Sequence, residues 1–596
     1  MRIVERVLVA APAQAVWERI SDPTRWPANL GRMHCRHVEG SAPSGPGARY
    51  WLHLEVGAAE VGSLIEVLEH EAGAGLSWTT IRGFEQRGHW RLRERDADSS
   101  EVTLSVAYQA SGGLAALVTD ELSAIFVRRY VHDALTSLAQ QLAGGQADTR
   151  AAGPGALLDA GARVIGEGAR TTSALARAGL LRPARPDRHA RSLTALARRG
   201  PTLPGRYAAA AALYPREPAL IDETAAVTFA TLQDRTDRLA SALAGHGVHA
   251  GERIAVVCRN HRLLIEALLA GCKLGAETLA LDTDLASASL GELITRERPR
   301  AVIYDAELAP RLGGCLRGRK AFIAAPELGA RPRHAALEQL IAEADIDARP
   351  APRGDGRIAT LSAAGTPPRA GGSWPSPTAL PCILERIPMR VRERVLLAAP
   401  LSGCWGVMQL SLASLLASTL VLQRRVDAEA TLAGIERERI AHCVTVPRLL
   451  EDILALAPEV RRGYDTSSLQ RVTVSGTLAG ELATRFMDEY GDILYSAYET
   501  PQLALVAIAC PTDLRRAPGT AGRPLRHMIV RVLDEHGAPV RAGESGRIYV
   551  ANDIPWGGAD SHAGRRPEGF LATGDVGHLD DHGRLFVEGE CYVRAG

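Results

Sequence analysis

Strand-like and helix-like patterns alternate along this 596-residue chain from Pro201 to its end. Short apolar runs typical of buried strands are followed by segments in which apolar residues recur with helical spacing. Alternation of this kind is typical of α/β folds. We therefore expect residues 201–596 to form a large α/β domain. The elements predicted in this way are strand-like runs at 227–232, 253–258 and 301–305, the last ending in an acid, and helices at 234–243 and 263–274.

Length and charge narrow the class of protein. A single hydrophobic core stops growing at roughly 250 to 300 residues, so this chain must hold several domains. Its 69 basic and 68 acidic residues nearly cancel, which argues against nucleic acid as a partner. Only Lys273 and Lys320 are lysines, so chemistry that needs an ammonium group must use one of these two side chains. Nine cysteines without a Cys-x-x-Cys pair favour a reducing, cytoplasmic compartment without structural zinc.

Residues 1–145 have the pattern of a separate α+β domain. Residues 2–9 predict a strand, and residues 11–20 predict a helix with Pro12 near its first turn. A long amphipathic segment at 117–142 predicts a helix that closes the domain. Between them lie β-rich runs separated by Gly, Ser and Asp turns, at 49–56, 60–69, 76–81, 89–95 and 101–109.

This order of elements resembles the START-like or polyketide-cyclase helix-grip fold, with residues 22–27 as the most suggestive local sequence. The resemblance implies a curved sheet around the C-terminal helix and an apolar cavity for a lipid or another hydrophobic molecule, without implying a catalytic residue. The alternative is a solid core, because most tryptophans fill cores. The tryptophans concerned are Trp17, Trp26, Trp51, Trp78 and Trp90.

Residues 146–200 predict an arginine-rich helical linker. Its segment 177–199 could contact a membrane surface peripherally, or it could pack as a linker helix against the next domain. Residues 395–423 form an uncharged run long enough to cross a bilayer, but they include Pro400 and several polar residues, so a buried core segment is expected. Charge in the first six residues argues against a signal peptide.

Residues 573–589 begin Thr-Gly-Asp and end Val-Glu-Gly. The stretch resembles the signature with which adenylate-forming, or AMP-binding, enzymes such as fatty-acyl-CoA synthetases close their large domain. This resemblance implies a fatty acyl substrate, ATP or AMP with Mg²⁺, and CoA, and it makes Asp575 the acceptor for both ribose hydroxyls. In that family a mobile lid with a catalytic lysine follows. Because the sequence stops at Gly596, we expect an adenylate-forming large domain that lacks the C-terminal lid.

Residues 360–368 align with the family's phosphate loop, Thr-Ser-Gly-Thr-Thr-Gly-x-Pro-Lys. Glycines and hydroxyls in such a loop donate hydrogen bonds to phosphate oxygens, and the lysine neutralises their charge. The nucleotide-binding residues implied here are Thr360, Gly365 and Thr366, but Pro368 replaces the lysine. Arg369 could supply a cation from the next position, although its planar fork is no direct substitute for a point charge.

Two further motifs carry the resemblance. In residues 400–406 the histidine that gates the acyl pocket of relatives falls on Gly403. The family's Tyr-Gly-x-Thr-Glu places Tyr498 on the tyrosine and Gln502 on the magnesium-binding glutamate, anchored upstream by Gly476. An alternative register makes Glu499 the metal-binding acid, with the tyrosine at 495. After the signature, Glu590 stands where relatives have a ribose-contacting arginine.

These substitutions support three hypotheses. In the first, the chain is a pseudoenzyme that binds an acyl or other hydrophobic group with a degraded ATP site. The second is an active long-chain fatty-acid–CoA ligase, which uses Arg369 and Glu499 as substitutes or receives a lid from another chain. The third makes the N-terminal domain the active part, as a carrier or an aromatase/cyclase-like catalyst.

Overall fold

A computed structural model describes residues 2–26, 33–38, 41–56, 59–83, 85–109, 131, 135–136, 138–139, 141–142, 170–181, 185–200, 202–326, 333–344, 356–361, 380–476, 478–500, 504–526, 528–552 and 570–590. The chain divides into two compact units. The first comprises Met1–Thr172 with Asn552–Gly557, and the second comprises Ser173–Ala551 with Gly558–Gly596.

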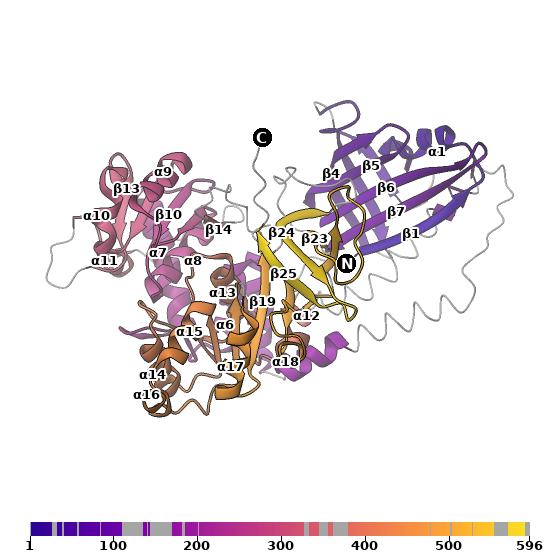
Figure 1. The fold of residues 1–596 in the computed structure, drawn as a ribbon. Coiled ribbons are helices and arrows are strands. Elements are labelled where there is room, and N and C mark those ends of the chain that lie inside the picture. Colours follow the sequence, from indigo (N-terminus) through magenta and orange to yellow (C-terminus); the bar gives the residue numbers. More distant parts are fainter. Residues whose placement is uncertain are drawn as a thin grey trace. The chain divides into compact units, whose positions relative to one another are not determined.

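A seven-stranded antiparallel sheet forms the first unit (Figure 1). The strand order is β1-β7-β6-β5-β4-β3-β2, and helix α1 (Ala13–Ile20) follows the first strand with Pro12 as its N-cap. Every predicted strand of this unit is present, and among the described strands the sequence analysis missed β2. The strands are β1 (Arg2–Val9), β2 (Met33–His37), β3 (Arg49–Val56), β4 (Ala59–Glu71), β5 (Gly75–Gly83), β6 (Glu85–Asp96) and β7 (Ser99–Gln109).

A cluster of tryptophans lies in the described core of this unit. The Trp26 ring lies 4.6 Å from the Trp78 ring and 6.3 Å from the Trp90 ring, centroid to centroid. Gly88 makes room for this cluster, because a Cβ there would lie 1.9 Å from the Trp78 indole. Trp17 is also buried, whereas Trp51 is half-buried. The described residues of the predicted segment 117–142 are helical, and Val131, Leu135, Leu138 and Ala139 join the same core.

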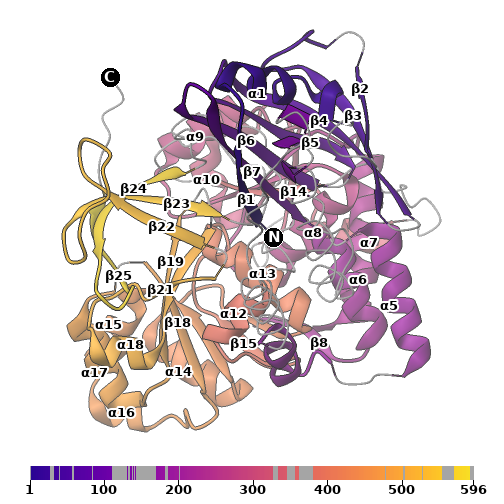
Figure 2. The same ribbon diagram turned by 90° about the vertical axis from the view of Figure 1, so that its right-hand side faces the viewer.

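Three sheets form the second unit. A five-stranded parallel sheet has the order β13-β12-β10-β11-β14, and a nine-stranded sheet has the order β21-β20-β19-β18-β17-β15-β16-β8-β9. Figure 2 shows the third sheet, β22-β23-β24-β25, in yellow. The strands are β8 (Pro218–Ile221), β9 (Ala226–Thr228), β10 (Arg253–Val257), β11 (Glu277–Leu281), β12 (Ala301–Tyr304), β13 (Lys320–Ile323), β14 (Arg357–Leu361), β15 (Arg394–Leu397), β16 (Thr419–Leu422), β17 (His442–Thr445), β18 (Arg471–Ser475), β19 (Leu494–Thr500), β20 (Ala504–Ala509), β21 (Arg523–Pro524), β22 (Met528–Leu533), β23 (Gly546–Asn552), β24 (Leu571–Leu579) and β25 (Leu585–Glu590).

Helices connect these strands, as the alternating pattern predicts. The longer ones are α5 (Pro186–Arg199), α6 (Leu203–Leu213), α7 (Phe229–Gly245), α8 (Arg262–Leu274), α9 (Ser287–Glu297), α13 (Cys404–Leu416), α14 (Ala428–Glu438), α15 (Pro447–Ala455) and α17 (Gly480–Tyr490). The shorter ones are α10 (Ala309–Leu312), α11 (Leu337–Glu343), α12 (Leu380–Arg386), α16 (Pro458–Arg462) and α18 (Pro511–Arg516).

One predicted boundary is wrong. The strand-like run at 227–232 ends as a strand at Thr228, and α7 begins at Phe229 rather than at residue 234. The Thr228 hydroxyl accepts a hydrogen bond from the Thr231 amide at 3.2 Å. This cap satisfies one of the free amides of the first turn and fixes the start of the helix.

The described part of the arginine-rich segment packs within the second unit. Arg188 in α5 donates to the Leu213 carbonyl at 3.1 Å, and Arg199 pairs with Asp237 of α7 at 3.3 Å. These contacts fit a linker helix that packs against its neighbour. Leu181 and Leu193 remain exposed.

The uncharged run at 395–423 supplies β15, α13 and β16, whose side chains are largely buried, as expected for a core segment. Among the described residues, every helix is too short or too polar to pass through a bilayer.

Candidate functional site at the carboxyl edge of the nine-stranded sheet

Six neighbouring strands of the nine-stranded sheet, β8, β16, β15, β17, β18 and β19, run parallel. Their carboxyl ends therefore meet at one edge. Ligands of open α/β sheets bind beyond this edge, where the connecting loops leave space. The last residues of the strands place Thr445, Ser475 and the pair Tyr498 and Glu499 there.

Tyr498 in β19 and Asp575 in β24 meet at this edge. The Tyr498 hydroxyl donates a hydrogen bond to Oδ2 of Asp575. Burial, together with this carboxylate, raises the pKa of the Tyr498 phenol far above its ordinary value, so the hydroxyl stays protonated. Thr573 accepts a hydrogen bond from the Asp575 amide at 3.1 Å and itself donates to the Ile548 carbonyl at 3.1 Å, which fixes the strand that carries the carboxylate.

Glu499 points toward the neighbouring strand β18. The Ser475 hydroxyl donates to its Oε1 at 2.8 Å. Its Oε2 is shut off from solvent and has no hydrogen-bond partner among the described residues. Burial raises the pKa of the Glu499 carboxyl to about 7, although the Ser475 hydrogen bond favours the ionised form.

Gly476 turns the chain directly after Ser475. Its φ of 112° is a conformation that residues with a side chain rarely adopt. A Cβ at this position would also approach Cδ of Pro447 to 3.5 Å. The glycine therefore allows the chain to leave β18 sharply beside Ser475.

The other residues implied by the resemblance lie as follows. Thr360 is half-buried near the end of β14 and pairs in register with Ala280 of β11. Gly403 is the N-cap of α13, and a Cβ there would meet only the Pro400 carbonyl, at 3.7 Å, so the site has room for a side chain. The remaining predicted residues, Gly365, Thr366, Arg369 and Gln502, lie outside the described residues.

Tyr495, the tyrosine of the alternative register, borders a different space. It lines a pocket of about 500 Å³ together with Arg386, Met389 and Cys510. Arg386 in this pocket donates to Asp513 at 2.7 Å and to the Ile508 carbonyl at 2.7 Å. The Arg386 guanidinium in this lining is therefore already paired.

Neither lysine of the chain lies at the carboxyl edge of the nine-stranded sheet. The Lys273 ammonium is buried between α7 and α8, where it donates to Asp237 at 2.8 Å, to Thr236 at 2.6 Å and to the Gln233 carbonyl at 3.1 Å. Lys320 is exposed at the start of β13. Lys273 therefore acts as a link between two helices.

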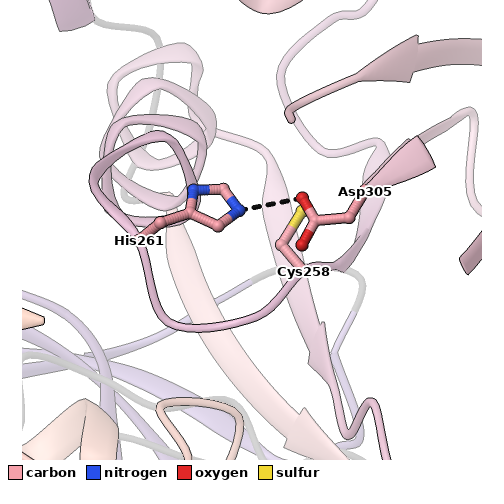
Figure 3. Close-up of side chains that lie close together, drawn as sticks. All are labelled: Cys258, His261 and Asp305. Carbon is pink, nitrogen blue, oxygen red and sulfur yellow. Dashed lines mark hydrogen bonds and ion pairs between the residues drawn. The ribbon is translucent and has the colours of Figure 1, made fainter. Parts of the chain in front are cut away.

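The sequence analysis missed a second cluster, at the end of the five-stranded sheet. Cys258, His261 and Asp305 place their ligand atoms within 4.8 Å of one another, and all three are buried (Figure 3). The parallel pairing of β10 with β12 brings them together across more than forty residues of sequence. The one available signal was the acid predicted at the end of strand 301–305.

Hydrogen bonds satisfy this cluster. His261 accepts the Leu264 amide on Nδ1 at 3.4 Å, and its Nε2 donates to Oδ1 of Asp305 at 2.8 Å. Oδ2 of Asp305 accepts from the Arg259 amide at 3.0 Å and lies 3.5 Å from the Arg424 guanidinium. Burial, aided by Asp305, raises the pKa of the Cys258 thiol well above its ordinary value. With a protonated thiol and an arginine already at the carboxylate, these three side chains fit a structural link better than a metal site.

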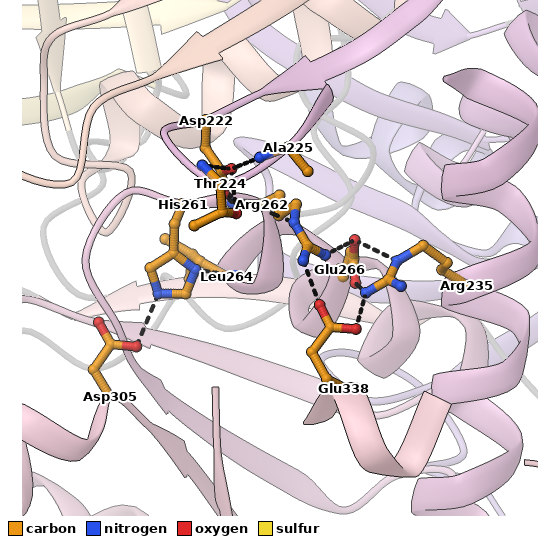
Figure 4. A network of polar contacts seen from close by, with 10 residues as sticks. All are labelled: Asp222, Thr224, Ala225, Arg235, His261, Arg262, Leu264, Glu266, Asp305 and Glu338. Atoms are coloured by element: carbon orange, nitrogen blue, oxygen red, sulfur yellow. Dashed lines mark hydrogen bonds and ion pairs between the residues drawn. The ribbon is translucent and has the colours of Figure 1, made fainter. Parts of the chain in front are cut away.

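Next to this cluster, side chains from the start of α8 belong to a network of charged residues (Figure 4). Glu266 is fully buried and binds Arg235 through two parallel hydrogen bonds of 2.9 Å. Arg262 contacts Glu266 at 3.3 Å and also pairs with Glu338 of α11. The Arg262 amide donates to Asp222 at 3.0 Å. The network joins α7, α8, α11 and the turn after β8.

Comparison with known proteins agrees with this architecture. The chain belongs to the AMP-binding enzyme family, whose pattern matches residues 207–355 and 378–555. Residues 1–143 match the family described as polyketide cyclase / dehydrase and lipid transport. The expected combination of an adenylate-forming domain with an N-terminal helix-grip domain is therefore confirmed.

Individual relatives are acid–CoA ligases. The indoleacetate–CoA ligase of Aromatoleum aromaticum is 28% identical over 376 residues, which cover 61% of this chain and 73% of the relative. The long-chain-fatty-acid–CoA ligase FadD13 of Mycobacterium tuberculosis is 23% identical over 404 residues, covering 63% and 76%. The structure of the anthranilate CoA ligase AuaEII with anthranoyl-AMP shares the fold, with a TM-score of 0.58 and 19% identity over 65% of this chain and 78% of that one.

The buried network gives a prediction about stability. Replacing Glu266→Gln leaves two partly buried guanidinium groups without their carboxylate, and we expect the free energy of unfolding to fall by about 3 kcal/mol. Urea denaturation measures this change. Glu451→Gln is the matched control, because Glu451 lies on the surface beside Arg448, and its loss should cost less than about 0.5 kcal/mol. Equal effects of the two substitutions would contradict this account of the network.

Glu499 predicts a pH dependence of stability. The pKa of its carboxyl is about 7 in the folded chain and near 4.5 when unfolded, so the folded state holds the proton more tightly. Stability from this group is therefore present at low pH and is lost as the pH rises toward and past 7. Between pH 5 and pH 8 the wild type should lose about 2 kcal/mol more than Glu499→Gln, measured by urea denaturation at each pH. Parallel pH profiles would show that Glu499 ionises normally.

Proposed function

We propose that the second unit binds an adenosine nucleotide and a carboxylic acid at the carboxyl edge of the nine-stranded sheet. The observation that carries this proposal is the hydrogen bond between Tyr498 and Asp575. The two residues come from different sheets, and the family resemblance assigns both to the adenosine. Their contact favours the register with Tyr498 as the family tyrosine over the one with Tyr495.

We further propose that formation of an acyl adenylate is weak or absent in this chain. The family's loop lysine is Pro368, its magnesium-binding glutamate is Gln502 in the favoured register, and its ribose-contacting arginine is Glu590. Removing one preorganised charge or donor typically costs roughly 10²- to 10³-fold in rate. Effects within one site do not simply multiply. Even two losses of this kind would nevertheless leave a slow enzyme.

The alternative is a working acid–CoA ligase in which Glu499 replaces the magnesium carboxylate. The surroundings of Glu499 disfavour this role. Mg²⁺ binds through hard anionic oxygens, whereas the pKa of about 7 leaves this carboxyl largely neutral below pH 7. Oε1 is also already occupied by Ser475.

For the first unit we propose a carrier or sensor of a hydrophobic molecule. Support comes from the match to a family described by lipid transport. The tryptophan cluster around Trp26 closes one part of the core, so the space for a ligand would lie between the sheet and the helix that contains Leu135.

Nucleotide binding tests the main proposal. The full chain should bind AMP with little dependence on Mg²⁺, and Asp575→Ala should weaken binding about 10- to 100-fold, because two hydrogen bonds to a charged acceptor are lost. Isothermal titration calorimetry measures both. Asp488→Ala serves as the control, since Asp488 is an exposed acid on α17 that pairs with Arg515. Unchanged affinity in Asp575→Ala would overturn the assignment of the site.

Turnover tests the second part of the proposal. With ATP, Mg²⁺ and either indole-3-acetate or a panel of fatty acids, pyrophosphate release should be at least about 10³-fold slower than the roughly 10 s⁻¹ of an ordinary enzyme. A coupled pyrophosphate assay gives the rate. Release at an ordinary rate would establish the active ligase instead.

A further inference from the structure

One buried carboxyl oxygen at the carboxyl edge of the nine-stranded sheet has no hydrogen-bond partner among the described residues. Oε2 of Glu499 is closed to solvent and accepts no hydrogen bond from any described residue, while Oε1 is held by Ser475 at 2.8 Å. Buried polar atoms are nearly always paired, because an unpaired one costs about 1 to 3 kcal/mol and more when it is charged. An unpaired oxygen that persists next to a proposed ligand site is therefore a candidate for contact with the ligand.

The order of strands places Glu499 between the two parts of the proposed site. Tyr498 reaches toward β24 and Asp575, whereas Glu499 reaches toward β18 and Ser475. Continuing across the sheet from β18, the next strands are β17 and β15. Gly403 lies in the turn that follows β15, where a Cβ would meet only the Pro400 carbonyl, at 3.7 Å. Glu499 is thus on the side of Tyr498 toward β18, in the direction of the strand that precedes Gly403.

The chemistry of this position favours one kind of acid. An alkyl chain against Oε2 would leave this oxygen unpaired. When Glu499 is ionised, its charge would then remain buried with no hydrogen bond to compensate it. A ring that carries an N–H or O–H group would donate to Oε2 and remove that cost.

We propose that Glu499 selects the acid substrate, favouring an aromatic acid with an N–H or O–H donor on its ring over an alkyl acid. This inference rests on the proposed binding of a carboxylic acid at the same edge. The indoleacetate–CoA ligase, a relative at 28% identity, is named for an acid with such a donor. Ser475 is the positioning residue, because its hydroxyl holds Oε1 and so directs Oε2.

The experiment compares two acids that differ in one group. Indole-3-acetate carries the ring N–H, and benzofuran-3-acetate has an oxygen in its place. Affinities of the full chain for both are measured by calorimetry at pH 8 with saturating AMP. We expect indole-3-acetate to bind about 10- to 100-fold more tightly, because a site built around a donor rejects the isostere that lacks it.

Variants of Glu499 then test whether its side chain causes the preference for indole-3-acetate. Glu499→Leu should reduce the ratio of the two affinities to about 1, with benzofuran-3-acetate binding as well as before or better. Glu499→Gln, which keeps the shape of the side chain, should also lose the ratio, because the Ser475 hydroxyl takes the amide oxygen and the amide nitrogen, a donor, stands at the Oε2 position; this variant decides the matter if the leucine variant does not fold. Glu481→Gln, an exposed acid at the start of α17, should leave the ratio unchanged.

Several outcomes would overturn the inference. They are equal affinity of the wild type for both acids, no measurable binding of either, or a ratio that survives in both Glu499 variants. If AMP binding persists in these cases, only the role of Glu499 fails. Loss of AMP binding in the wild type would instead defeat the proposed function itself.

Discussion

A short backbone junction between two sheets is the constraint on which the candidate site depends. The Ala521 amide donates to the Leu585 carbonyl at 2.7 Å, and the Leu585 amide donates to the Gly522 carbonyl at 2.7 Å. Gly522 permits the close approach of this segment to β20, since a Cβ there would lie 2.1 Å from the backbone of Ile508 and Ala509. The junction fixes the four-stranded sheet beside β20 and β21, and only then can Asp575 reach Tyr498.

The electrostatics of the edge follow from that arrangement. Asp575 and Glu499 both lie at this edge, and carboxylates are a poor environment for a triphosphate unless cations balance them. A neutral donor at Asp575 and a raised pKa at Glu499 set the state of these two groups. Tyr498 donates to Asp575, and burial lets Glu499 retain its proton near neutral pH. A neutral nucleoside portion and an uncharged ring suit such an edge better than a chain of phosphates does.

The sequence predicted the elements of the fold better than it predicted the site. Alternation of apolar residues revealed all but one of the strands described for the first unit, because period-two patterns are local. It missed β2, a short strand whose residues include His34 and Arg36. Asp575 and Tyr498 were predicted as site residues from sequence motifs. No local sequence pattern could predict that Cys258 lies beside Asp305 or that Oε2 of Glu499 is unpaired. Both features depend on which strands become neighbours in the sheets.

Arginine usage links the stability of the second unit to its chemistry. The pair of Arg235 and Glu266 uses the planar fork of the guanidinium for two parallel hydrogen bonds, a geometry that an ammonium cannot reproduce. Such forks suit buried ion pairs, because each satisfies several donors at once. Of the two lysines, Lys273 is buried between α7 and α8, where one compact charge binds three acceptors. The cations of the described charge networks therefore hold helices together, and the carboxyl edge depends on the neutral donors of Ser475 and Tyr498.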